Sequence, residues 1–188
     1  MDETAPRPDT SAAADPATVL AEWQAREALL LGRIRERGVS RPEQLTGRTG
    51  LQWLQAMLDG ELPSAPIFET LDFMLVELER GRAVFQGAPL YRHYNPMGGV
   101  HGGWFATVLD SALGCAVHST LGVGRGYTTA ELKTNIVRPL SDKIVRVRAE
   151  GKVIHLGKRM ATAEARMTGP DGKLYAHATT TCFLFDTP

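Results

Sequence analysis

The sequence predicts an α+β fold in which a curved antiparallel sheet wraps around one buried helix. Three observations predict this class. Residues 104–117 are apolar almost all round, which is typical of a helix that is buried on every side. The segments before and after that helix read as β-strands. Turn-forming residues between neighbouring strands predict hairpins, so the long helix is expected to lie between two groups of antiparallel strands.

The strands are expected in two groups. Before the helix, the apolar-rich runs 71–78 and 82–87 are joined by Glu79-Arg80-Gly81. After it, residues 127–138 and 144–153 alternate, and residues 159–168 and 173–185 pair around the turn Gly169-Pro170-Asp171-Gly172. Strict alternation in 127–138 predicts one face of Ala130, Leu132, Thr134 and Ile136, and an opposite face of Thr129, Glu131, Lys133 and Asn135.

An N-terminal arm precedes this body. Residues 1 to about 15 show no periodicity and are expected to form a disordered tail. Residues 16–62 are expected to form a helical extension, and residues 63–188 the main domain. The first helix starts at Asp15-Pro16 and is expected to run through Arg37, with Gly38 as its end. A second helix starts at Thr49, whose spacing to Gln52 is that of a capping box.

The composition excludes several classes of protein. Lys plus Arg and Asp plus Glu are both 21 in 188 residues, and a net charge of zero argues against a general nucleic-acid binder. No apolar run approaches the roughly 18 residues of a membrane-spanning helix. The N-terminus lacks the pattern of a secretory signal. Cys115 and Cys182 are far apart and are expected to be free thiols in a reducing cytosol, so we expect a cytoplasmic protein without membrane contact.

Asp110 is the most informative polar residue. It is the only Asp or Glu between Glu79 and Glu131, and it lies in the middle of the apolar helix. An ionised carboxylate in such a place is unfavourable unless it is paired or partly hydrated. A solvent-facing or purely structural carboxylate explains the pattern as well as a catalytic one does. The residues at the start of the same helix favour a general base.

Gly102 and Gly103 open that helix. Free backbone N–H groups at a helix N-terminus bind developing negative charge, and glycine lets a carbonyl group approach the backbone closely. The pair therefore resembles an oxyanion hole, although a tight turn into the helix explains two glycines equally simply. Asp110 lies eight residues beyond Gly102, about 12 Å along the helix axis. We therefore expect each site to combine the donor of one subunit with the acid of its neighbour.

The segments HYNPMGGVHGGWFATVLDSALGCAVHSTL, GYTTAELKTNIVRPL and EGKVIHLGKRMATAEARM carry a resemblance to a known family. Over roughly residues 50–185 the chain resembles the PaaI-type, phenylacetate-degradation branch of the hotdog-fold acyl-CoA thioesterases. The combination of HGG, the following Asp and the TTAELK…RP strand is far more specific than HGG alone. The resemblance implies the hotdog fold for the α+β class predicted above.

The resemblance also implies roles for single residues. Asp110 matches the helix carboxylate that acts as general base or nucleophile, and Gly102 matches the glycine whose N–H polarises the thioester carbonyl. Asn95 matches a loop amide that holds the thioester or the water. Thr129 matches a hydroxyl that orients the water, with Thr128 as the adjacent alternative. Some relatives carry a threonine where this chain has Gly114.

Other polar residues are expected to have supporting roles. His101 shapes the glycine loop by hydrogen bonding, and with Gly103 it is assigned to substrate binding. His93 and His118 have no evident nucleophile to activate, because Ser111 lacks a GxSxG context and Cys115 lacks a nearby base. No set of His, Cys, Asp and Glu has the spacing of metal ligands, so no metal or other cofactor is expected.

Residues 133–166 contain nine Lys or Arg and three Asp or Glu, a local charge of +6. Most of this charge is expected to lie on a solvated strand face. Coenzyme A carries phosphates that require cations near the mouth of the cleft, and Arg138, Lys158 and Arg159 stand at strand ends or turns where such contacts fit. The lack of interleaved aromatic residues argues against RNA as the partner.

The resemblance implies hydrolysis of aryl, phenylacetyl-type or short-to-medium acyl-CoA by a homodimer or a dimer of dimers, with a homotetramer the expected state. Two alternatives stay open: a hotdog hydratase or dehydratase, which uses a His together with an acid, and a non-catalytic acyl-CoA sensor. The aromatic and apolar side chains near the motif are candidates for the acyl pocket or for core and dimer packing: Tyr94, Met97, Trp104 and Phe105.

Overall fold

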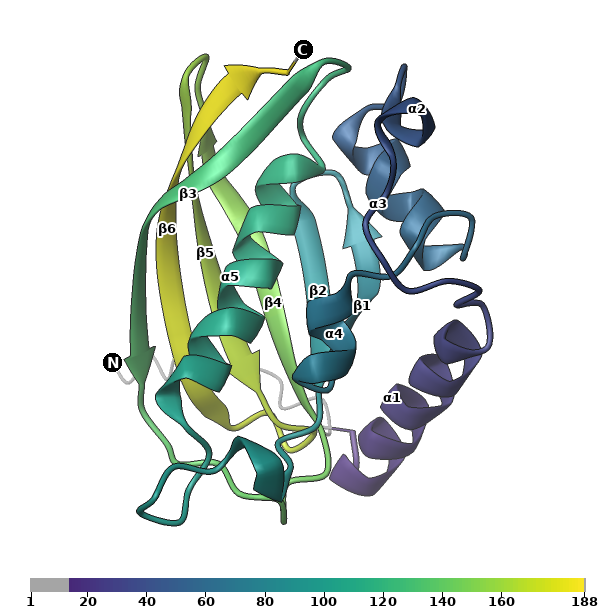
Figure 1. Ribbon diagram of the computed structural model, residues 1–188. Coiled ribbons are helices and arrows are strands. Elements are labelled where there is room, and N and C mark those ends of the chain that lie inside the picture. Colours follow the sequence, from purple (N-terminus) through teal and green to yellow (C-terminus); the bar gives the residue numbers. More distant parts are fainter. Residues whose placement is uncertain (1–13, 188) are drawn as a thin grey trace, which may run out of the picture.

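The computed structural model describes residues 14–187, and in them one six-stranded sheet curves around one long helix (Figure 1). The strand order is β1-β2-β4-β5-β6-β3, and all neighbours are antiparallel. Helix α5, Gly102–His118, lies along the concave face of the sheet. The predicted α+β hotdog architecture is confirmed. The predicted tail falls largely on residues 1–13, outside the described residues.

The six strands lie close to the predicted segments. β1 and β2 form the first hairpin at Phe73–Glu79 and Arg82–Gly87, and β4 and β5 the second at Val147–Leu156 and Met160–Thr168. β6, Leu174–Asp186, pairs with β5 on one side and with β3, Arg125–Ile136, on the other. β3 is therefore an edge strand, with unpaired backbone groups along one side within the protomer.

Two glycines allow α5 to lie close to the sheet. A Cβ atom at Gly151 of β4 would lie 2.3 Å from the carbonyl oxygen of Ala112, so helix backbone and strand backbone are in direct contact there. A Cβ at Gly114 would lie 2.4 Å from the hydroxyl of Tyr127 on β3. The position where some relatives carry a threonine is thus filled by a tyrosine from the sheet. The helix is buried because the sheet approaches it at these two points.

A β-bulge at Ala130 corrects the alternation predicted for β3. Thr129 pairs with Cys182 and Glu131 pairs with Thr181, so Ala130 has no partner of its own in the ladder. Opposed residues share a face, and Cys182 is fully buried on the face toward α5. The extra residue therefore places both Thr129 and Leu132 on the inner face, where strict alternation had put them on opposite faces.

Residues 14–70 contain four helices, where the sequence predicts two. α1 spans Pro16–Leu31, α2 Pro42–Leu45, α3 Gly50–Leu58 and α4 Pro66–Thr70. The predicted helix end at Gly38 is wrong, because the chain leaves the helix at Gly32 and packs Arg33 against Gly60. Arg37 then pairs with Ser64 as extended backbone. The predicted capping box of α3, Thr49 with Gln52, is confirmed.

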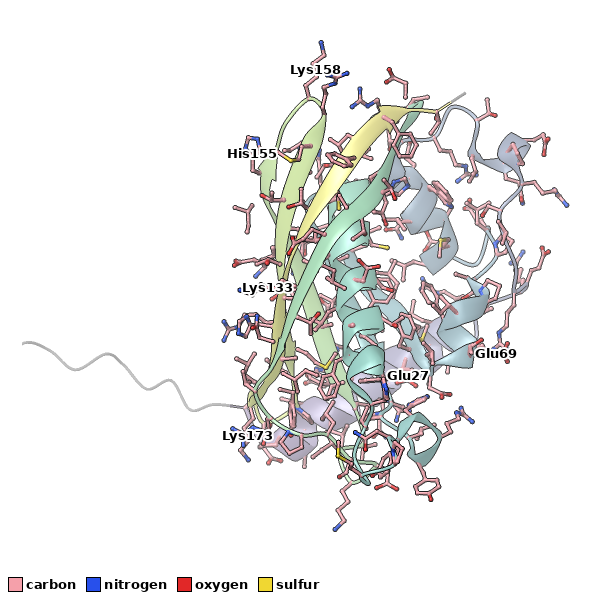
Figure 2. All side chains as sticks on the ribbon, turned by 60° about the vertical axis from the view of Figure 1, so that its left-hand side comes forward. Glu27, Glu69, Lys133, His155, Lys158 and Lys173 are labelled. Atoms are coloured by element: carbon pink, nitrogen blue, oxygen red, sulfur yellow. The ribbon has the colours of Figure 1, made fainter. Side chains whose placement is uncertain are left out.

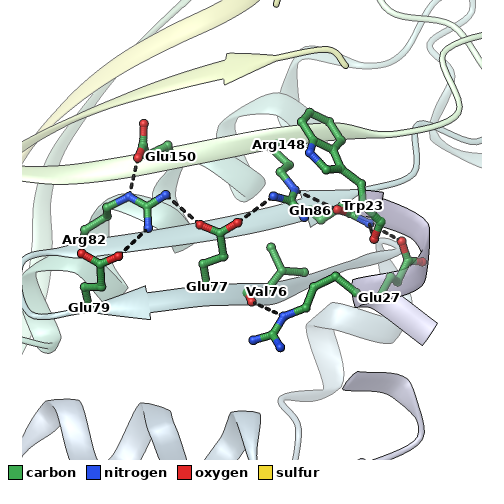
Figure 3. A network of polar contacts seen from close by, with 10 residues as sticks. Trp23, Glu27, Val76, Glu77, Glu79, Arg82, Gln86, Arg148 and Glu150 are labelled. Atoms are coloured by element: carbon green, nitrogen blue, oxygen red, sulfur yellow. Dashed lines mark hydrogen bonds and ion pairs between the residues drawn. The ribbon is translucent and has the colours of Figure 1, made fainter. Parts of the chain in front are cut away.

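Charged side chains connect α1 to the outer face of the sheet (Figure 3). Glu27 of α1 accepts from Arg146 and from Gln86, and Gln86 in turn accepts from Arg148 at 2.9 Å. The guanidinium group of Arg148 lies 4.5 Å from the ring centroid of Trp23. On the far side of the network, Arg82 bonds to three carboxylates, those of Glu77, Glu79 and Glu150. Two arginines of the basic stretch therefore bind the N-terminal extension and are not free for a ligand.

α3 packs against the C-terminal end of α5. The N–H of Gly50 donates to the carbonyl of Leu121, and a Cβ at Gly50 would lie 1.9 Å from the carbonyl oxygen of His118. The His118 ring lies against Trp53, with ring centroids 4.8 Å apart, and neither ring nitrogen has a hydrogen-bond partner among the described residues. Burial lowers the pKa of His118 to about 4. No helix in residues 14–187 combines the length and apolarity needed to cross a bilayer.

The contact at Gly151 predicts a large effect of a single methyl group. Gly151→Ala should lower the free energy of unfolding by about 2 kcal/mol, because the methyl group meets helix backbone, which cannot rotate away. Gly122→Ala is the matched control, since a Cβ there has no atom within 4 Å. Urea unfolding of both variants measures the difference. Equal unfolding free energies would contradict the direct contact between helix and strand.

His118 predicts a loss of stability in acid. Above pH 6.5 the ring is neutral in both the folded and the unfolded state. As the pH falls from 6.5 towards 4, the unfolded chain binds a proton that the folded protein does not, so the free energy of unfolding decreases by about 3 kcal/mol. His118→Leu should remove this part of the pH dependence. The difference in unfolding free energy between wild type and variant, measured by urea at pH 4, 5, 6 and 7, tests it, and a constant difference would refute it.

Candidate active site

The turn into α5 leaves one backbone donor without an acceptor. The N–H of Val100 donates to Leu140, that of His101 to the carbonyl of His93, and that of Trp104 to the carbonyl of His101. Between His101 and Trp104, the N–H of Gly103 donates to Nδ1 of His101 at 2.8 Å, so His101 is the N-cap of the helix. Among the described residues, the N–H of Gly102 alone in this turn has no acceptor. The structure thus distinguishes Gly102, whose N–H is free, from Gly103, whose N–H is occupied.

Gly102 lies at the edge of a groove. The groove has a volume of about 410 Å³ and is lined by residues of the glycine loop, the start of α5 and the end of β3: Asn95, Gly99, Val100, Gly102, Phe105, Ile136, Val137, Arg138, Pro139 and Leu140. Three residues predicted from sequence, Asn95, Gly102 and Arg138, therefore line one surface. Ile136 and Val137 are about half exposed and form an apolar rim.

Asn95 lines the groove and has its amide oxygen bonded to the loop backbone. Its Oδ1 accepts from the N–H groups of Met97 at 2.9 Å and Gly99 at 3.3 Å. Because both partners are donors, the oxygen must face the loop backbone, and the NH₂ group remains for a ligand. The amide thus holds the loop with one atom and offers a donor with the other.

Asp110 and Thr129 form a second pair, two helical turns along α5 from Gly102. The hydroxyl of Thr129 donates to Oδ1 of Asp110 at 3.0 Å. Thr128 points to the outer face, because it pairs with the exposed Phe183. The structure thus selects Thr129 over Thr128. Because of the bulge at Ala130, Thr129 can face Asp110 while Leu132 also faces inward. Sequence periodicity could not have revealed the contact between Thr129 and Asp110.

The surroundings of Asp110 do not supply a nucleophile. Burial, with a smaller effect from the Asp110 carboxylate, raises the pKa of the neighbouring Cys115 thiol to about 12, so this thiol stays protonated at neutral pH. Ser111 donates to the carbonyl of Thr107 within the helix. Burial also raises the pKa of Tyr127, which stays a neutral phenol. Asp110 is therefore the side chain of this region with base character.

The remaining predicted residues lie elsewhere. Arg138 packs over Tyr175, with 6.0 Å to the ring centroid, at the end of the sheet where β6 begins. Lys158 and Arg159 form the β4–β5 turn, and Figure 2 shows Lys158 at the end of the sheet opposite Lys173. The three cations do not converge on one site within a protomer. In residues 14–187 no group of His, Cys, Asp and Glu could hold a metal ion.

Comparisons with known proteins bear on this arrangement. A family model described as "Thioesterase superfamily" matches residues 97–176, which include Gly102, Asp110 and Thr129. A Saccharolobus solfataricus protein named "Putative esterase SSO2140" is 33% identical over 122 residues, which are 64% of this chain and 84% of that protein. The chain belongs to the thioesterase superfamily.

Solved structures place it within the superfamily. The phenylacetic acid degradation protein PaaI of Thermus thermophilus, solved as a point mutant, is 29% identical with a TM-score of 0.56, covering 63% of this chain and 97% of that one. A phenylacetic acid degradation-related protein of Ralstonia eutropha is 26% identical with a TM-score of 0.64, covering 70% and 98%. The chain is thus a PaaI-type hotdog protein, and about a third of it has no counterpart in those structures.

Proposed function

We propose that this protein is an acyl-CoA thioesterase that hydrolyses aryl, phenylacetyl-type or short-to-medium acyl-CoA to the free acid and CoA. The observation that carries the proposal is the N–H of Gly102, which alone in its turn has no acceptor among the described residues. Gly102 lines a groove together with Asn95 and Arg138. A donor aimed at a developing oxyanion is the main requirement of acyl transfer. Membership of the thioesterase superfamily supports a thioester as the bond that is hydrolysed, and the groove residues suggest that this thioester is one of CoA.

The chemistry follows from the two pairs of residues. The thioester carbonyl oxygen accepts from Gly102 N–H and from the Asn95 amide, which stabilise the negative charge that develops on it. Asp110 either takes a proton from the attacking water and passes it to the departing thiolate of CoA, or attacks the carbonyl carbon itself. The second route expels the thiolate, which takes a proton from solvent, and forms a mixed anhydride that water then hydrolyses to the free acid and the Asp110 carboxylate. Thr129 holds one carboxylate oxygen, so the other is directed to the reaction. No cofactor is needed in either route.

A homodimer, or a dimer of dimers, brings these groups together. Gly102 and Asp110 of one helix are about 12 Å apart, too far to act on one carbonyl. A two-fold axis near Ala106, midway between them, places Gly102 of one protomer opposite Asp110 of the other. The side of α5 at this level carries small residues, Gly103, Ala106 and Thr107, none of them fully buried within the protomer, which permits close approach. β3 offers a free edge for continuing the sheet.

The same symmetry suggests a phosphate site. Arg138 lies in the groove, whereas Lys158 and Arg159 lie at the opposite end of the sheet. Antiparallel association brings the β4–β5 turn of one protomer towards the groove of the other. Cations from both subunits then face the nucleotide of CoA, as proposed from their strand-end positions.

The two alternatives have less support. A hydratase or dehydratase uses a His beside the acid, and here the hydrogen-bond partner of Asp110 is Thr129. A sensor has no need of a carboxylate two turns from the free N–H. The free thiols of Cys115 and Cys182 fit the cytoplasmic location that a CoA ester substrate implies.

Thiol release from a panel of aromatic and aliphatic acyl-CoA esters tests the proposed function. Wild type should hydrolyse at least one class, and Asp110→Asn should lower kcat by about 100-fold or more with KM little changed, because the base is lost and the contacts to CoA are kept. Full turnover by Asp110→Asn would refute the assignment of Asp110. No turnover of any ester by the wild type would favour the sensor.

Subunit complementation tests the shared site. Gly102→Pro removes the free donor at the first position of α5, where proline fits, and His101 already has the extended backbone that precedes a proline. Gly102→Pro and Asp110→Asn homo-oligomers should both be nearly inactive. Co-expressed, they should regain activity, because one site of the mixed dimer combines wild-type Gly102 with wild-type Asp110. Failure of the mixture to exceed either parent would show that each site lies within one chain.

Thr129 and Thr128 form a matched pair for testing carboxylate orientation. Thr129→Val keeps the shape and removes the donor to Asp110, and kcat should fall about tenfold, the effect of one hydrogen bond to a charged group. Thr128→Val changes an outward side chain and should leave kcat within about twofold. Steady-state kinetics on the best ester of the panel measures both. An equal effect of the two substitutions would contradict the role of Thr129.

A further inference from the structure

Asp72 has an unfavourable backbone conformation that its side-chain contacts explain. It lies between α4 and β1 with φ of +53°, and it is the only non-glycine residue of 14–187 with positive φ. Its carboxylate accepts from Arg92, with Nε at 2.6 Å, and lies 3.0 Å from Nε2 of the buried His93. A strained conformation persists where surrounding contacts require it, and it often accompanies a functional constraint. The contact with the buried ring is the candidate for that constraint.

The protonation of His93 follows from its other contacts. Nδ1 accepts from the N–H of Leu90 at 3.1 Å, so the proton of the neutral ring is on Nε2. This nitrogen lies 3.0 Å from Oδ2 of Asp72, close enough for an ion pair but without the alignment of a hydrogen bond. The ring stacks on Trp104, in the first turn of α5, with centroids 5.6 Å apart and planes 24° apart. His93 thus connects the carboxylate of Asp72 to the start of the catalytic helix.

The same residue fixes the backbone beside Gly102. The carbonyl oxygen of His93 accepts from the N–H of His101 at 2.8 Å, and Nδ1 of His101 accepts from the N–H of Gly103. The N–H groups on both sides of Gly102 are therefore held, which fixes the peptide between them. The indole N–H of Trp104 donates to the carbonyl of Leu71 at 2.8 Å, which ties the turn that carries Asp72 to the same helix.

We propose that Asp72 and His93 form a positioning pair that holds the free N–H of Gly102 in the direction of the substrate carbonyl. The pair lies before residues 97–176, the range of the family model, and it touches no substrate itself. The inference rests on the proposed thioesterase function, because it assigns the Gly102 N–H to the oxyanion. Looser positioning weakens a bond made mainly in the transition state, so the pair should affect kcat more than KM.

The charges around His93 set the sign of a pH effect. Burial lowers its pKa, Asp72 from the α4–β1 turn opposes this, and Arg92 from its own turn adds to it, while Trp104 from α5 is uncharged. Protonation would place a second N–H on Nδ1, facing the donor of Leu90. The neutral ring is therefore the working form, and kcat should fall when His93 becomes protonated in acid, below pH 6.5.

The kinetic test uses three variants of the full-length protein. Asp72→Gly accepts positive φ without strain and removes the carboxylate, and Asp72→Asn tolerates the same backbone and keeps a weaker acceptor. We expect kcat to fall about tenfold in Asp72→Gly and less in Asp72→Asn, with KM within about twofold. Arg92→Ala, which removes only the exposed partner, should keep kcat. A change in KM alone, or equal losses in Asp72→Gly and Arg92→Ala, would overturn the proposal.

A second readout needs no substrate. Proton NMR follows the titration of the His93 ring, assigned by its absence in His93→Phe. Its midpoint should lie below 6.5 in wild type and lower still in Asp72→Gly, because the nearby negative charge is gone. An unchanged midpoint would show that Asp72 does not hold the ring. Since Asp110→Asn tests the proposed function independently, failure of the pair and failure of the thioesterase assignment give different results.

Discussion

The direct contact between α5 and β4 at Gly151 is the constraint on which the rest of the structure depends. Without a side chain at Gly151 the helix lies directly on the strand, so the sheet can curve around it and bury its apolar sides. Burial of those sides leaves one strip of α5 uncovered within the protomer, and Asp110 lies on that strip. The helix therefore serves two purposes. It is the core element of the fold, and its exposed strip and N-terminus carry the groups proposed for catalysis.

The site is built by irregular backbone at two places around this regular helix. At the start of α5, caps and loop contacts occupy every neighbouring N–H and leave that of Gly102 unpaired among the residues that the structure describes. In β3, the bulge at Ala130 turns Thr129 inward to Asp110. Neither feature follows from propensity, since each depends on contacts with segments far along the chain. Departures from regular geometry commonly occur where a protein needs one group to face a ligand.

Some arginines of the basic stretch, which looks in sequence like a ligand-binding surface, instead hold the N-terminal extension on the sheet. Arg146 and Arg148 belong to the basic stretch, yet Arg146 binds Glu27 of α1, and Arg148 binds Gln86 of β2 and the face of Trp23 of α1. Paired in this way they contribute to docking α1 on the outer face of the sheet. Arg138 lies outside this network and lines the same groove as Gly102.

Local sequence patterns determined much of this protein. Apolar periodicity determined the strands and the buried helix, and the spacing of Thr49 and Gln52 determined the start of a further helix. The isolation of Asp110 in an apolar segment indicated its candidate role. Tertiary structure decided what periodicity cannot encode. The first helix ends at Leu31, well before the predicted Arg37, which instead pairs with Ser64 as extended backbone. In β3, one unpaired residue in the ladder reverses the face of Thr129. The physical reason lies in the pairing of distant backbone groups. This pairing decides which side chains of a strand face inward and which N–H groups are left without an acceptor, and short-range patterns in the sequence carry no information about it.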